Sequence, residues 1–86
     1  MENTLLLQEL ENLAAKLDIT VRYEDGDFRT GICRVKDEQL LLVNKKLSNE
    51  QKILQIAKEL GKIDLSNIYI LPQLRERISS LAETEP

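Results

Sequence analysis

The 86-residue chain contains no histidine and no tryptophan, and it has a single cysteine. Histidine is the commonest ligand for protein-bound zinc and the side chain that most readily carries protons near neutral pH, so its absence removes the usual basis for both kinds of chemistry. A lone Cys33 excludes an internal disulfide and fits a reducing compartment. We therefore expect a fold held together by packing alone, with no metal and no cofactor.

Aromatic residues and long apolar runs are also scarce. Only Tyr23, Phe28 and Tyr69 carry rings, while 42% of the residues are hydrophobic, so the predicted core is aliphatic. The longest apolar runs, residues 5–7 and 40–43, are far too short to span a bilayer. The first residues, Met1-Glu2-Asn3, lack the positive charge that begins a secretory signal peptide. These features predict a cytoplasmic protein without a membrane segment.

Positive charge is in the minority, with 12 Lys and Arg residues against 15 Asp and Glu and a net charge of −3. Neutralisation of phosphates by Lys and Arg dominates nucleic-acid affinity, and the sequence contains no basic patch with interleaved aromatic residues. An acidic chain is equally unsuited to an anionic membrane surface. We expect no nucleic-acid partner and no membrane partner.

Hydrophobic periodicity divides the first half of the chain into one helix and three strands. Apolar residues in 4–17 recur at helical spacing, and the pattern changes at Ile19 to the alternation of a strand. Further strands are predicted over about 28–35 and over 39–44. The continuous apolar run in the second is typical of a central strand buried on both faces, or of a strand with a covered edge. Because the connections are short and polar, the prediction is a three-stranded antiparallel meander.

The second half of the chain predicts two helices. Ser48 and Gln51 form a capping-box pattern, and the helix that they open reaches Leu60, with Gly61 expected as the residue just after its end. Pro72 begins a last helix, since proline is tolerated in a first turn. The predicted fold is α+β in the order α-β-β-β-α-α, a single domain over residues 1–86 with a frayed tail at 83–86.

The helix near residue 60 contains the segment Lys58-Glu59-Leu60-Gly61-Lys62. The zincin signature, His-Glu-x-x-His, places two imidazoles one turn apart on a helix to bind zinc, with the glutamate acting on the bound water. A three-stranded meander, a polar turn with a capping serine and this helix resemble small gluzincin-type peptidases of the ImmA/IrrE group. The resemblance covers roughly residues 19–63 and is carried by the layout more than by any one residue.

Both positions that would hold zinc ligands in that family are lysine here. A protonated ammonium group has three donors and no lone pair, so Lys58 and Lys62 cannot coordinate a metal in that state. The resemblance also implies a glutamate ligand from the last helix, where only Glu76 is available. We assign no catalytic, cofactor-binding or metal residue and expect a non-enzyme. Two interpretations stay open: a relative without ligands, or an ordinary amphipathic helix with a wet polar face.

Other residues with chemical potential have simpler structural interpretations. Cys33 lies in mid-strand with no histidine to activate it, which favours packing over reactivity. The acidic residues of the two strand connections lack the alternating twelve-residue pattern of a calcium loop. Arg75 and Arg77 flank Glu76 in a pattern typical of a solvated helix face.

Two functions are compatible with these patterns. Five aliphatic residues are hard to bury together in so small a core, which favours a non-catalytic interaction module with a protein partner or as a homodimer; they are Leu5, Leu41, Ile68, Ile70 and Leu71. The alternative is a degenerate metallopeptidase-like regulatory domain that recognises a peptide in a groove beside the strand preceding the helix. An enzyme using Glu59 with either lysine would need a concave pocket with perturbed pKa values, which nothing in the sequence requires.

Overall fold

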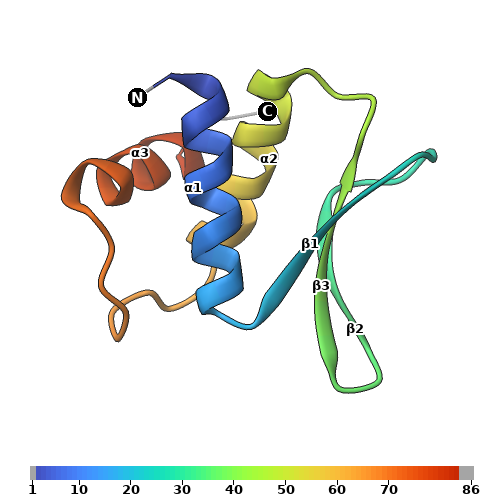
Figure 1. The fold of residues 1–86 in the computed structure, drawn as a ribbon, viewed down its shortest axis with the longest axis horizontal. Coiled ribbons are helices and arrows are strands. Elements are labelled where there is room, and N and C mark those ends of the chain that lie inside the picture. Colours follow the sequence, from blue (N-terminus) through green and yellow to red (C-terminus); the bar gives the residue numbers. More distant parts are fainter. Residues whose placement is uncertain (1, 84–86) are drawn as a thin grey trace.

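The protein is an α+β domain whose computed structural model describes residues 2–83. Its three helices lie together on one side and the three strands on the other (Figure 1). The predicted class and element order are confirmed, while a frayed end over 84–86 lies outside the described residues. The elements are α1 (Asn3–Lys16), β1 (Ile19–Glu24), β2 (Gly31–Val35), β3 (Glu38–Asn44), α2 (Asn49–Gly61) and α3 (Pro72–Ala82). Within residues 2–83, no helix is long and apolar enough to cross a membrane.

The sheet is mixed, and the predicted antiparallel meander is wrong. Its strand order is β1-β3-β2, so β3 is central; β2 runs antiparallel to β3, while β1 runs parallel to it. The tight turn Lys36–Asp37, with Lys36 at a φ of 59°, fixes β2 against β3. Earlier in the chain, residues 25–30 connect β1, at one edge of the sheet, to β2, at the opposite edge. A reversal at each connection leaves β1 and β3 pointing the same way.

The core forms between the helix side of the sheet and the two helices that cover it. α1 packs on β1 and α2, while α2 packs on β3 and α3 (Figure 1). From β3, Leu41 and Val43 are fully buried in this core. The predicted surplus of aliphatic residues is thus only partly real, because Leu41 and Ile70 are buried. Leu5 and Leu71 remain 44% and 47% exposed.

The first turn of α2 is capped by a side chain, whereas its last turn is shaped by close packing against α3. Ser48 caps the first turn as predicted, since its side-chain oxygen accepts a hydrogen bond from the Gln51 amide at 3.2 Å. Gly61, by contrast, belongs to the last helical turn and is not the left-handed residue beyond it. A Cβ built at Gly61 would lie 2.8 Å from the Ala82 Cβ. Glycine is needed here because α3 approaches α2 too closely for a second methyl group.

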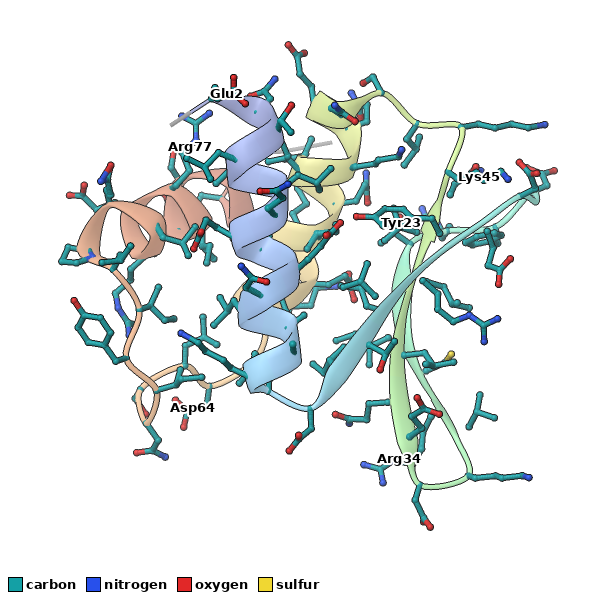
Figure 2. All side chains as sticks on the ribbon, in the orientation of Figure 1. Glu2, Tyr23, Arg34, Lys45, Asp64 and Arg77 are labelled. Atoms are coloured by element: carbon teal, nitrogen blue, oxygen red, sulfur yellow. The ribbon has the colours of Figure 1, made fainter. Side chains whose placement is uncertain are left out.

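Tyr23 links three elements at the boundary between the sheet and the helices, where Figure 2 labels it. Its hydroxyl donates a short hydrogen bond to the Glu11 carboxylate of α1. The Lys52 ammonium of α2 lies 5.2 Å from the centre of its ring, within cation–π range. Burial, then the hydrogen bond to Glu11 and the charge of that carboxylate, raise the pKa of Tyr23 well above its ordinary value.

The close contact of α2 with α3 generates a first prediction. Replacing Gly61 by alanine should lower the free energy of unfolding by about 1–2 kcal/mol, since overpacking outweighs the better helix propensity of alanine. Adding Ala82→Gly removes the opposing methyl group and should restore about 1 kcal/mol in the double variant. Urea denaturation of the wild type, both single variants and the double variant measures this coupling. Strictly additive effects would contradict the assigned contact.

The raised pKa of Tyr23 generates a second prediction. In the unfolded chain a tyrosine ionises near pH 10, whereas the folded protein keeps Tyr23 protonated to higher pH. The stabilisation is therefore complete below about pH 10 and is lost as the pH rises toward the folded pKa. We expect Tyr23→Phe to reduce the alkaline loss of stability measured by urea denaturation between pH 9 and pH 11. Tyr69→Phe is the matched control, because Tyr69 is 73% exposed, and it should follow the wild type.

Candidate functional site

The polar side of α2 lines an open groove of about 890 Å³. Gln55, Lys58 and Glu59 come from this helix, and Lys62 directly follows its last residue. The exposure of the side chains differs, with Lys62 at 72% and Glu59 at only 17%. Lys58 and Gln55 are half-buried. The sequence predicted a polar, wet face, and the structure places Gln55, Lys58 and Lys62 of this face in a concave surface.

The facing wall is the chain segment that leads into β2. Phe28, Arg29 and Thr30 line the groove from this side. Asn44 and Leu47, which end and follow β3, line it as well. A further part of the lining is supplied by Ala82 and Glu83 at the end of α3. Four separate parts of the chain thus build a single groove.

Local contacts hold the segment before β2 in place. Gly26 adopts a φ of +150°, a conformation that residues with a side chain rarely adopt. A Cβ at Gly26 would lie 3.0 Å from the Phe28 ring, so the ring packs directly on this glycine. The Asn44 side-chain amide donates a hydrogen bond to the Gly26 carbonyl at 2.8 Å. These contacts tie the connection to the end of β3 and so set one wall of the groove.

The segment that lines the groove at residues 28–30 leads into a strand that has a neighbour on one side only. β2 pairs with β3 and forms an edge of the sheet. An edge strand leaves a row of backbone donors and acceptors available to another strand. Arg34 lies near the hairpin end of β2, and Lys45, which follows β3, lies at the opposite end of the sheet (Figure 2). The site therefore combines a helix-lined groove with an adjoining free strand edge.

The charges in the groove are unevenly neutralised. The Lys62 ammonium forms an ion pair with Glu59 at 2.9 Å, one helical turn away. Among residues 2–83, no carboxylate forms an ion pair with Arg29 or Lys58. Glu83 lies at the end formed by Gly61 and Ala82. The part of the groove between Arg29 and Lys58 consequently carries uncompensated positive charge.

The described residues include no group of three or more Cys, Asp or Glu side chains placed to hold a metal ion. Glu76, the acidic residue that the family resemblance implied as a ligand, is exposed on α3 and does not line the groove. Glu83, which directly follows α3, does line the groove. The groups present offer hydrogen bonds, positive charge and a small apolar surface, which suit recognition of another molecule.

The remaining candidates from the sequence lie elsewhere. Cys33 is half-buried in β2 and pairs in register with Leu40, outside the groove. Asp25 forms an exposed ion pair with Lys45 at 3.5 Å, as expected for a polar turn. Arg75, Glu76 and Arg77 are exposed, as predicted for a solvated helix face. The Arg75 guanidinium also donates to the Leu65 and Ile68 carbonyls at 3.3 and 3.2 Å. It thereby fastens the loop between α2 and α3.

Sequence reasoning found the helix wall of the site but missed Arg29, Thr30 and Glu83. No spacing signal connects them with α2, since they reach the groove through the strand order and through the approach of α3. Phe28 carried a usable signal. It is a lone ring beside a glycine turn, and such a ring usually has a packing partner.

Comparisons of this chain with protein-family models, with curated proteins and with solved structures found no match. The likeness to gluzincin-type peptidases therefore stays a prediction that rests on the residues of the sequence alone.

Proposed function

We propose that this chain is a non-catalytic protein-interaction module that holds an extended polypeptide segment in the groove beside α2. The observation that carries the proposal is that residues 28–30 line the groove beside α2 and lead directly into β2, an edge strand of the sheet. A segment that pairs with the edge of β2 would gain main-chain hydrogen bonds, and its continuation beyond Gly31 would reach the groove lined by residues 28–30. Edge pairing thus supplies affinity, and the groove supplies selectivity.

The chemistry of the lining supports binding without catalysis. A nucleophile or general base needs a partner that activates it and a pKa suited to proton transfer. Glu59 is instead engaged in an ion pair with Lys62, and Cys33 lies outside the groove. Lys58 contributes charge and donors only. The lining therefore supports recognition of a ligand and gives no basis for its cleavage.

The position of the groove also supports the metallopeptidase-like version of this proposal. The segment Lys58-Glu59-Leu60-Gly61-Lys62 supplies much of the α2 wall. In the family that the sequence resembles, the corresponding helix carries the zinc ligands. On this interpretation, the chain keeps a place for a peptide beside the helix and has lost the metal. It would then regulate or recognise a partner without cutting it.

Self-association through an apolar patch has weaker support. The exposed large hydrophobic residues in 2–83 come from different elements: Leu5 from α1, Val35 from β2, and Tyr69 and Leu71 from the loop before α3. Leu41 and Ile70, which had suggested a surplus, are buried. We therefore favour a polypeptide partner in the groove over a homodimer formed by an apolar face.

Filling the groove tests this proposal. Random ten-residue peptides displayed on phage are selected on the immobilised chain, and the selected peptides are titrated into the ¹⁵N-labelled protein. We expect amide shifts along Gly31–Val35 and the groove side of α2.

Gln55→Trp should weaken binding at least tenfold, because Gln55 is half-buried in the groove wall. Gln51→Trp is the matched control, since Gln51 is exposed on the same helix and outside the lining; it should bind normally. Binding that Gln55→Trp leaves unchanged would contradict the proposal.

Restoring histidine tests the loss of metal binding. The wild type should show no heat of Zn²⁺ binding through the groove at pH 7, because lysine ammonium groups have no free lone pair. The double variant Lys58→His/Lys62→His places two neutral imidazoles one turn apart and should bind Zn²⁺ at least about a hundredfold more tightly. Isothermal titration calorimetry compares the two proteins. Equal affinities would argue that these positions have nothing to do with a lost metal site.

A further inference from the structure

Arg29 and Lys58 both line the groove and bring positive charge to it from two different parts of the chain. Arg29 is exposed on the segment before β2, while Lys58 is half-buried on α2. Neither forms an ion pair within residues 2–83. An unpaired and partly desolvated ammonium group interacts more strongly with an incoming anion than a fully hydrated one does. The pair is therefore a receptor for negative charge on a ligand.

The distribution of charge around this pair makes the feature selective. The chain as a whole carries a net charge of −3. Within the groove, the Glu59 carboxylate forms an ion pair with Lys62 at 2.9 Å. Glu83 lies at the end of the groove formed by α3. A carboxylate on the ligand is therefore favoured between Arg29 and Lys58 and disfavoured near Glu83. The groove would therefore distinguish ligands by the sign of their charge and by the position of that charge along the bound segment.

We infer that the groove takes an acidic extended polypeptide segment, with a carboxylate side chain placed between Arg29 and Lys58. The inference rests on the proposed function and names the class of partner for the same groove. Carboxylates form short, charge-assisted hydrogen bonds with guanidinium and ammonium groups, and these are stronger than neutral ones. Side chains of an extended strand alternate between its two faces, so acidic residues at every second position face the same wall.

A second copy of the chain fits this groove less well. The other edge of the sheet is β1, beside a hollow lined by Glu11, Asp18 and Thr20, and it could supply acidic groups. Joining β1 of one copy to β2 of the next, however, leaves a free edge at each end of the growing assembly. Such head-to-tail contacts extend into filaments unless the rotation between copies closes a ring. A separate acidic segment completes the groove without this consequence.

Charge-matched peptides test the inference. Three fluorescein-labelled ten-residue peptides share alternate valines and differ only in the intervening residue, which is glutamate, glutamine or lysine. Fluorescence anisotropy at two salt concentrations gives their affinities, and amide shifts of the ¹⁵N-labelled chain locate the binding. We expect the glutamate peptide to bind at least tenfold more tightly than the lysine peptide, with a difference that shrinks at high salt. Lys58→Glu should abolish the preference, and the milder Lys58→Gln should reduce it. Lys16→Glu is the matched control and should keep it, because Lys16 is exposed at the end of α1, outside both the groove lining and β2.

The possible outcomes separate the two proposals. A preference that Lys58→Glu removes and Lys16→Glu retains supports an acidic ligand. Equal binding of all three peptides, with shifts along β2 and α2, overturns the acidic ligand and leaves the groove as a polypeptide site. Failure of these peptides and of every phage-selected peptide to shift those amides overturns both proposals. Concentration-dependent oligomers in light scattering that Lys58→Glu dissociates assign the groove to a second copy and overturn the separate partner.

Discussion

The burial of β3 is the constraint on which the rest of the structure depends. Leu41 and Val43 are fully buried on the helix side of the sheet, and β3 has a strand on each edge. A central position lets both edges of β3 pair their backbone groups while its buried side chains stay under the helices. Once β3 is central, the tight turn at Lys36 assigns β2 to one edge, and β1 must take the other. The free edge of β2 follows from the central position of β3.

The groove depends in turn on how closely the helices pack. α2 lies on β3 with its apolar side and turns its polar side toward the segment before β2. The contact between Gly61 and the Ala82 methyl group brings the end of α3 to the same place, so that Glu83 joins the lining. A single absent methyl group thus positions one end of the candidate site. The helix face that suggested metal chemistry in the sequence forms a wall of the groove instead of an open surface.

Much of the fold could be predicted from the sequence, because it is encoded in local patterns. The helical spacing, the serine cap and the proline at the start of α3 all correspond to the observed elements. The apolar run of residues 40–43 even predicted a central strand, which is incompatible with a meander in which β2 lies in the middle. Combined with the tight turn at Lys36, that run implied the parallel pairing of β1. Arg29 and Glu83 could not be predicted, since only tertiary packing brings them beside α2.

The contact of Tyr23 with Glu11 and Lys52 has a spectroscopic consequence. The chain has no tryptophan, and its other tyrosine, Tyr69, is 73% exposed in a loop. Tyr23 is therefore the tyrosine held in an asymmetric, partly buried environment between α1, β1 and α2. Near-ultraviolet circular dichroism in the tyrosine band thus reports mainly on one residue. The near-ultraviolet circular dichroism of the unlabelled protein can therefore monitor the packing of the helices on the sheet.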